Sequence, residues 1–225
     1  MLVLCDGSLV GTVGGGGMER VLVGEALEAL RSGRAGVVRF ALGVPPREGF
    51  LAVDSRCGGE VEVLVDPVRP DPRLVILGSG LIAQATSRVA QLCGFQVTVV
   101  DDAPTATQEN FPGATLVNGP YPQSLEGVEV RPGDYVAVLH GETDFELEAL
   151  RFALRARPAF IGLLGSANKR RSHLEQLASE GFPRGELERV YGPIGLEIGA
   201  ETAEEIAVSI VAQLIRVRRG LEPSP

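Results

Sequence analysis

The stretch RLVILGSGLIAQA, residues 73–85, joins an apolar run to a glycine turn. Its first five residues are typical of a buried strand, and its last five of the start of a helix. Gly78, Gly80 and Ala83 fit the pattern G-x-G-x-x-G/A at the junction. In that pattern the first glycine makes a tight turn, the second lets N–H groups reach a pyrophosphate, and the third small residue allows close packing. The stretch predicts the opening of a Rossmann-like domain.

The next apolar run, FQVTVV, ends in Asp101 and Asp102, about 20 residues after the turn, where a ribose-binding acid belongs. The pair also suits a solvated strand end, and the same turn serves non-enzymatic members of the fold. The pattern therefore predicts the fold and leaves open whether NAD(P) binds.

Downstream, apolar strands alternate with helical stretches. The strands are expected in DYVAVLH (134–140) and AFIGLLG (159–165). The helices are expected at 144–155, 168–180 and 202–219, the last with Thr202 and Glu205 as a capping box. Strands that are apolar on both faces and alternate with helices are typical of a parallel sheet covered on both sides. We expect an α/β Rossmann-like domain over 73–220, followed by a tail over 221–225.

Upstream, residues 1–68 predict a small α+β domain. Asp6-Gly7 lies between two short apolar runs and predicts a hairpin. A helix is expected from Met18 to a terminating Gly33, and strands in GVVRFAL (36–42) and GEVEVLVDP (59–67). The proline-rich DPVRPDPR predicts a linker, which we place at 69–72.

A run of four glycines precedes the first helix. Gly14, Gly15, Gly16 and Gly17, followed by Glu19, could present N–H groups to a phosphate, or form a passive hinge, while Glu19 could simply complement the helix dipole. Cys57 lies in RCGGE and is either a metal or sulfur ligand or a small buried residue.

A second strand-turn-helix junction lies in GLLGSANKRRSHLEQL. Gly165 and Ser166 form the turn, and Lys169, the sole lysine, stands with Arg170 at the helix start. Cations there suit an anionic ligand, although a solvated basic face is the alternative. His173, further along the helix, is expected to be exposed.

Two more candidates are expected at the carboxyl edge of the sheet, where ligands bind in this architecture. His140 ends the strand DYVAVLH, and Gly195 lies in a glycine-rich approach to the last helix. Either could be a plain structural residue.

Composition excludes several classes of protein. The net charge of −8 argues against a nucleic-acid partner, and the apolar runs are too short to span a membrane. Three scattered cysteines suggest a reducing compartment, so we expect a cytoplasmic protein. The sequence lacks C-x-x-C, H-E-x-x-H and Walker motifs and has two histidines, so we assign no catalytic residue.

Six stretches form a recognisable set: DGSLVGTVGGGGME (6–19), CGGEVEVLVDP (57–67), LVILGSGLIAQA (74–85), VTVVDD (97–102), FIGLLGSANKRR (160–171) and GPIGLEIGAETAEEIAVSIVAQLI (192–215). In content and order, over nearly the whole chain, they resemble the xanthine dehydrogenase accessory family of the XdhC/CoxI type. The resemblance implies a maturation chaperone that binds molybdenum cofactor (molybdopterin) and assists its sulfuration and insertion. The implied partners are a molybdenum hydroxylase client, a cysteine desulfurase and a second copy of the chain in a homodimer.

The chain departs from the family at three points. Relatives usually begin earlier, with a helix and a strand, and many have cysteine at the position of Met18. Relatives often have two histidines after the fourth strand, whereas here His140 matches the first and Glu142 falls near the second. The alternatives to a chaperone are an NAD(P)-dependent oxidoreductase and a relative that has lost ligand binding.

Overall fold

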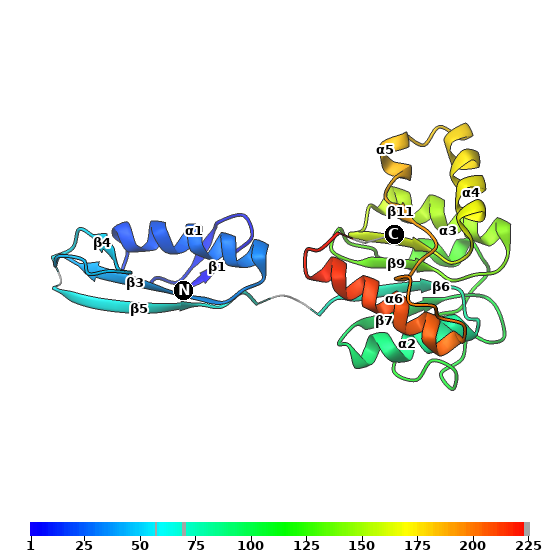
Figure 1. Ribbon diagram of the computed structural model, residues 1–225, viewed down its shortest axis with the longest axis horizontal. Helices are drawn as coiled ribbons and strands as arrows, with labels where there is room; N and C mark the ends of the chain where they lie inside the picture. Colours follow the sequence, from blue (N-terminus) through cyan, green and yellow to red (C-terminus); the bar gives the residue numbers. More distant parts are fainter. Residues whose placement is uncertain (57, 69–70, 223–225) are drawn as a thin grey trace. The chain divides into compact units, whose positions relative to one another are not determined.

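The computed structural model describes residues 1–56, 58–68 and 71–222, and divides into two compact units, residues 1–70 and 71–225 (Figure 1). The fold class expected from the sequence is confirmed: a small α+β unit precedes a Rossmann-like parallel sheet. Among the described residues, no helix is both long and apolar enough to cross a bilayer.

The N-terminal unit is a hairpin, a helix and a three-stranded sheet. Its elements are β1 (Leu2–Val3), β2 (Leu9–Val10), α1 (Gly16–Ser32), β3 (Gly36–Leu42), β4 (Leu51–Val53) and β5 (Gly59–Val65). The hairpin, the helix and strands β3 and β5 are confirmed, whereas β4 was not expected from the sequence. Helix α1 ends as expected at Gly33, which has a left-handed φ of 68° and donates its N–H to the Ala29 carbonyl at 2.7 Å.

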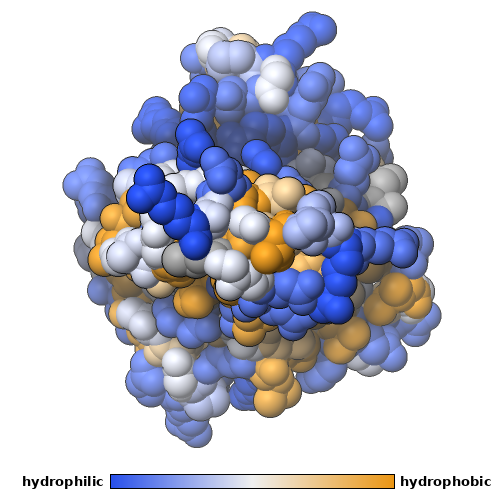
Figure 2. Space-filling model, turned by 90° about the vertical axis from the view of Figure 1, so that its left-hand side faces the viewer, coloured by the Kyte–Doolittle hydropathy of each residue, from blue (hydrophilic) through white to orange (hydrophobic). Residues whose placement is uncertain are grey.

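One face of this small sheet is covered by α1. Met18, Leu22 and Phe40 form its buried cluster. Apolar side chains also reach the surface of the unit, among them Val10, Leu64 and Val68, which are 59%, 67% and 80% exposed. Figure 2, in which the left-hand side of Figure 1 faces the viewer, shows apolar side chains grouped among hydrophilic ones.

The C-terminal unit is a six-stranded sheet flanked by helices. Its strands are β6 (Arg73–Leu77), β7 (Gln96–Val100), β8 (Thr115–Val117), β9 (Tyr135–Val138), β10 (Phe160–Leu163) and β11 (Val190–Tyr191). Its helices are α2 (Leu81–Leu92), a 3-10 turn (Gln123–Gly127), α3 (Thr143–Ala156), α4 (Ala167–Ser179), α5 (Arg184–Leu187) and α6 (Ala203–Arg218). The expected capping box of Thr202 and Glu205 is present at α6. Strands β8 and β11 were not expected.

All strand pairs in this sheet are parallel, in the order β11-β10-β9-β6-β7-β8. The chain therefore builds outward from β6 in one direction and returns to build outward from β9 in the other. The carboxyl ends of β6 and β9, which are neighbours, mark the point where the strand order reverses. Ligands bind at this point in doubly wound sheets.

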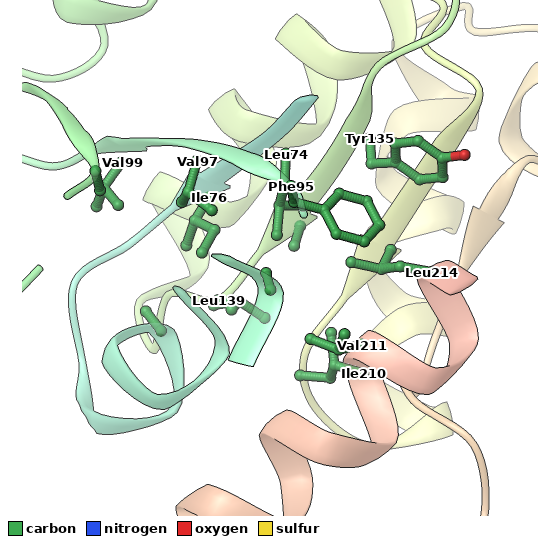
Figure 3. Close-up of a cluster of buried hydrophobic side chains, with 14 of the residues drawn as sticks. Leu74, Ile76, Phe95, Val97, Val99, Tyr135, Leu139, Ile210, Val211 and Leu214 are labelled. Atoms are coloured by element: carbon green, nitrogen blue, oxygen red, sulfur yellow. The ribbon is translucent and has the colours of Figure 1, made fainter. Parts of the chain in front are cut away.

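Each face of the sheet has its own apolar core. On one face, Ile210, Val211 and Leu214 of α6 pack near Leu74 and Phe95 of the β6–β7 region (Figure 3). On the other face, the leucines of α3 and Leu177 of α4 cover the alternate residues of the same strands. The prediction of a sheet covered on both sides is confirmed.

One expectation about the helices is wrong. His173 was expected to be exposed, but it is 4% exposed on α4. Its ring lies against the carboxylate of Glu146 on α3, with His173 Nε2 2.9 Å from Glu146 Oε2. His173 is therefore buried against Glu146, a residue of another helix that the local sequence around His173 does not indicate.

Candidate functional site

The glycine turn after β6 is open on its helical side. Gly78 has a φ of 121°, and a Cβ there would lie 2.6 Å from the Leu139 carbonyl oxygen, so this position admits glycine alone. Gly80 has an ordinary φ of −69°, and a Cβ there would meet nothing within 4 Å. Gly80 is also the N-cap of α2, with no side-chain cap. The amino end of α2 at the switch point is therefore exposed and has no side-chain cap, which suits an anion.

Side chains hold this turn in place from beneath. The Ser79 hydroxyl lies 2.5 Å from the Thr105 hydroxyl, and the Gln84 amide donates to the Ser79 carbonyl at 3.2 Å. Ser79 is 1% exposed, and Ala83, one of the expected site residues, is fully buried where α2 packs on the sheet. These contacts connect the turn to the loop after β7 and to α2.

The two acids after β7 have different surroundings. Asp101 is 2% exposed, and its Oδ1 accepts the Ala103 N–H at 3.1 Å. Asp102 is exposed, and its Oδ2 accepts the Tyr121 N–H at 3.4 Å. Asp102 is therefore the acid that a ligand can reach, and Asp101 shapes the loop.

His140 follows β9 next to the open turn. Its backbone nitrogen lies 3.0 Å from the position of a Cβ on Gly78. Its Nδ1 accepts the Glu142 N–H at 3.0 Å, and its ring stacks on Phe145 with centroids 4.4 Å apart and planes 4° apart. The strand end therefore holds the imidazole in a defined orientation at the carboxyl edge.

The turn after β10 is filled by its own helix. A Cβ on Gly165, which has a φ of 132°, would lie 2.6 Å from Cδ of Lys169. Ser166 caps α4 by accepting the Lys169 N–H at 3.2 Å. The Lys169 ammonium pairs with Glu146, a fully buried carboxylate that also contacts His173. Lys169, expected to meet an anionic ligand, already has an anionic partner inside the protein.

Arg170 and Gly195 serve the packing around β11. Arg170 donates through Nε to the Val190 carbonyl at 2.7 Å. Gly195 donates its N–H to Gln213 Oε1 at 2.8 Å and approaches Ser209 on α6 so closely that a Cβ would collide with its hydroxyl. Gly165 and Gly195 do line one hollow of about 320 Å³, together with mainly apolar residues of the β10 and β11 ends and of α6.

The four-glycine turn of the N-terminal unit is occupied by a side chain of the same unit. Oε1 of Glu19 accepts the N–H of Val13 at 3.1 Å, the N–H of Gly15 at 3.0 Å and the Thr12 hydroxyl. Thr12 in turn accepts the Gly14 N–H at 3.0 Å. The Thr12 hydroxyl, followed by the two backbone N–H groups, holds the pKa of Glu19 below its ordinary value. Of the four glycines, Gly15 thus binds an internal carboxylate directly, and Gly14 binds it through the Thr12 hydroxyl.

Cys57, expected as a metal or cofactor ligand, lies outside the described residues. Among residues 1–56, 58–68 and 71–222, no group of three or more histidine, cysteine, aspartate or glutamate side chains is placed to hold a metal ion.

Sequence reasoning missed four residues of this edge: Thr105, Tyr121, Phe145 and Glu146. Glu146 lies in the acidic first turn of α3, where a carboxylate also complements the helix dipole. The spacing of Lys169 and His173, four residues apart on one helix face, was the signal that could have indicated a shared acid. Tyr121 and Phe145 follow no motif.

Residues 74–214 match the XdhC Rossmann domain, and residues 1–41 match the XdhC and CoxI family. This protein belongs to the XdhC and CoxI family. The family resemblance expected from the sequence is confirmed.

Three curated relatives share this family likeness. The chain is 36% identical over 223 residues to the uncharacterised protein YqeB of Escherichia coli (strain K12), covering 98% of this chain and 40% of YqeB. It is 33% identical over 159 residues to a probable xanthine dehydrogenase subunit from Bacillus subtilis (strain 168), covering 70% of this chain and 46% of that protein. It is 25% identical over 268 residues to the molybdenum cofactor insertion chaperone PaoD of E. coli (strain K12), covering 97% and 77%. The family member described here thus spans less than half the length of the first two.

A solved structure shares the fold. A xanthine dehydrogenase from Bacillus halodurans superposes with a TM-score of 0.61 at 23% identity, covering 96% of this chain and 85% of that one. The likeness extends over both units and supports the fold assignment.

Proposed function

We propose that this protein is an accessory protein that binds molybdenum cofactor and assists its insertion into a molybdenum hydroxylase. Its family and its likeness to PaoD, whose name describes a molybdenum cofactor insertion chaperone, support this role. The likeness to a protein named for xanthine dehydrogenase supports a hydroxylase as the client.

The observation that carries the proposal is the open amino end of α2 at the switch point of the sheet. Molybdenum cofactor carries a phosphate or, in its dinucleotide form, a pyrophosphate. The absence of a Cβ at Gly80 leaves room for such a group to approach the first amides of α2. A side chain at residue 80 would extend into this open space.

The chain's own residues then bind and orient the ligand. The α2 amides hold the phosphate end, Asp102 faces ligand hydroxyl or amino groups, and the apolar hollow beside Gly165 and Gly195 suits an uncharged ring. The bound cofactor supplies redox chemistry, which the client enzyme uses. The acid Glu146 at this edge is already paired with Lys169 and His173 inside the fold, which favours carriage over turnover.

Three further details of the role are inferred from the family resemblance: the sulfur supply, the compartment and the number of copies. We propose that the cofactor is held while a cysteine desulfurase supplies its sulfur, that this takes place in the cytoplasm, and that two copies of the chain act together.

The experiment compares two glycines with the same backbone freedom. Gly80 and Gly133 both have open space at the Cβ position and no positive φ, but Gly133 precedes β9 at the opposite edge of the sheet. Each is changed to alanine, and the proteins are purified anaerobically from cofactor-producing cells. We expect pterin and molybdenum to accompany the wild type and Gly133→Ala, and to be lost from Gly80→Ala.

Absence of pterin and molybdenum from the wild type under these conditions, with no protection of added cofactor, contradicts the proposal. Equal loading of Gly80→Ala and wild type would move the binding site away from α2.

A second candidate is an NAD(P)-dependent oxidoreductase. The exposed Asp102 after β7, at the position that binds ribose in dinucleotide enzymes, favours it. Fluorescence titration with NADH and NADPH distinguishes the two. Tight binding together with hydride transfer to a carbonyl compound would replace the chaperone by this candidate.

A further inference from the structure

The aromatic residues behind His140 form a continuous column. The His140 ring stacks on Phe145, and Phe145 stacks on Tyr121 with centroids 4.4 Å apart and planes 23° apart. The Tyr121 hydroxyl donates to the Phe145 carbonyl at 3.0 Å. The backbone N–H of Tyr121 donates to Asp102, so the column spans from the β9 end to the loop after β7.

The phenol at the far end of the column stays a hydrogen-bond donor. Burial, and then the negative charges of Glu148, Asp101 and Asp102, raise the pKa of Tyr121. The neutral hydroxyl therefore keeps its proton and its bond to the backbone of Phe145.

The hydrogen bond at Nδ1 fixes the protonation pattern of His140. A backbone N–H can only donate, so Nδ1, which lies 3.0 Å from the Glu142 nitrogen, must accept. A neutral ring that accepts at Nδ1 carries its proton on Nε2. In the part of the chain that the structure describes, Nε2 has no hydrogen-bond partner. The ring thus offers an N–H donor and has no second lone pair for a metal.

We propose that Phe145 and Tyr121 are positioning residues that hold His140 in this tautomer, so that His140 donates a hydrogen bond from Nε2 to an oxygen of the anionic ligand bound by the α2 turn. The inference rests on the proposed function for the position of that ligand. It excludes His140 as a metal ligand in the resting protein. It also assigns a task to two aromatic residues that belong to no motif.

Two substitutions separate the nitrogen atoms of the ring. Asparagine places an acceptor near the position of Nδ1 and offers no donor at Nε2, whereas the amide of glutamine reaches the position of Nε2. The probe is inorganic pyrophosphate, measured by calorimetric titration. We expect His140→Asn to weaken binding about 10- to 100-fold, as for a lost hydrogen bond to a charged group, and His140→Gln to stay near the wild type.

The aromatic column is tested at Phe145 by the same titration and by a direct measurement of the tautomer. Phe145→Leu should weaken binding nearly as much as His140→Asn, Phe145→Tyr should restore it, and adding Phe145→Leu to His140→Asn should cost little more. Long-range proton–nitrogen NMR on histidine-labelled protein should place the His140 proton on Nε2 in the wild type, and show averaging in Phe145→Leu. With two histidines in the chain, His140→Gln assigns the signals.

The outcomes distinguish a failure of this inference from a failure of the phosphate site at α2. Full binding by His140→Asn, or a proton on Nδ1 in the wild type, overturns this inference and leaves the α2 site standing. No pyrophosphate binding by the wild type overturns the ligand-facing half of the inference together with the phosphate site. Binding that is lost in Gly80→Ala and in His140→Asn, but kept in His140→Gln, supports both.

Discussion

The glycine turns at 14–17 and 78–80 have the same sequence signal, but the surroundings of their backbone amides differ. In the first, the Glu19 carboxylate accepts two backbone N–H groups from within the unit. In the second, the amino end of α2 has no side-chain cap, and a Cβ on Gly80 would meet nothing within 4 Å. Glycine frees main-chain amides in both places, and a nearby acidic side chain decides whether they remain available to a ligand.

The turn at Gly165 shows a third arrangement. There the lysine stem fills the space above the glycine, and a buried carboxylate neutralises the ammonium. Charge at a glycine turn is therefore no sign of a ligand until the internal partner of that charge is known.

The largest expected effect is at Gly78, the structural glycine of the open turn. Gly78→Ala combines a strained φ of 121° with a Cβ 2.6 Å from a backbone oxygen, and we expect it to destabilise the C-terminal unit by about 4 kcal/mol. Gly80→Ala should change stability by less than about 0.5 kcal/mol. Urea unfolding of both variants measures this contrast within one turn, and equal losses would contradict it.

The next effect concerns the filled turn after β10. Glu146→Ala leaves Lys169 and His173 without their carboxylate, and we expect a loss of about 3 kcal/mol. Glu148→Ala on the same helix is the control, because its pair with Arg151 is half-exposed and contributes less than about 1 kcal/mol. Thermal unfolding at neutral pH compares the two, and similar losses would mean that the buried contacts stabilise little.

A smaller effect tests how the open turn keeps its shape. Ser79→Ala removes the bond to Thr105, and we expect a loss of about 1 kcal/mol together with weaker ligand binding. Thr105→Val removes the partner hydroxyl from an exposed residue, and it should also lower the stability and weaken ligand binding. If both variants bind pyrophosphate as tightly as the wild type, the turn does not depend on this bond.

The smallest effect is the pH dependence of the occupied turn. Because folding lowers the pKa of Glu19 from its ordinary 4.5, the stabilisation is present above pH 4.5 and is lost as the pH falls through the lowered value. The difference between wild type and Glu19→Ala, followed by NMR of α1 amides in urea, should therefore shrink on acidification. A difference that is constant with pH would mean that Glu19 acts by packing.

Glu19→Ala also tests whether the glycine turn at 14–17 can bind an external anion, as proposed for the turn at 78–80. With Glu19 removed, the Gly15 amide is free, so phosphate should shift its NMR signal in Glu19→Ala and leave it unchanged in the wild type. A shift in the wild type would show that the carboxylate gives way to external anions.

Local sequence was enough for β6, α2 and β7, because a buried apolar strand, a glycine turn and a following acid constrain each other. The helix ends at Gly33 and Thr202 were also readable, since caps are local. Strands β4, β8 and β11, of two or three residues each, form only by pairing with longer neighbours, so no periodicity indicates them.

The site was less readable than the fold, because its partners come from different elements. Glu146 meets Lys169 and His173 across two helices, and Tyr121 meets Phe145 across 24 positions. The sequence predicts each charged or aromatic residue as plausible by itself. Apart from the four-residue spacing of Lys169 and His173, it contains no signal for which of them are already satisfied inside the fold.

Helix α6 completes the core that β6 begins. Ile210, Val211 and Leu214 pack with Leu74 and Ile76, about 135 positions earlier in the chain (Figure 3). A ribosome synthesises the chain from its amino end, so one face of the first strand of this unit must wait for the last helix to leave the exit tunnel. Until then, the nascent sheet exposes apolar surface that general folding chaperones recognise. The core on this face of the sheet can therefore close only after α6 has been synthesised.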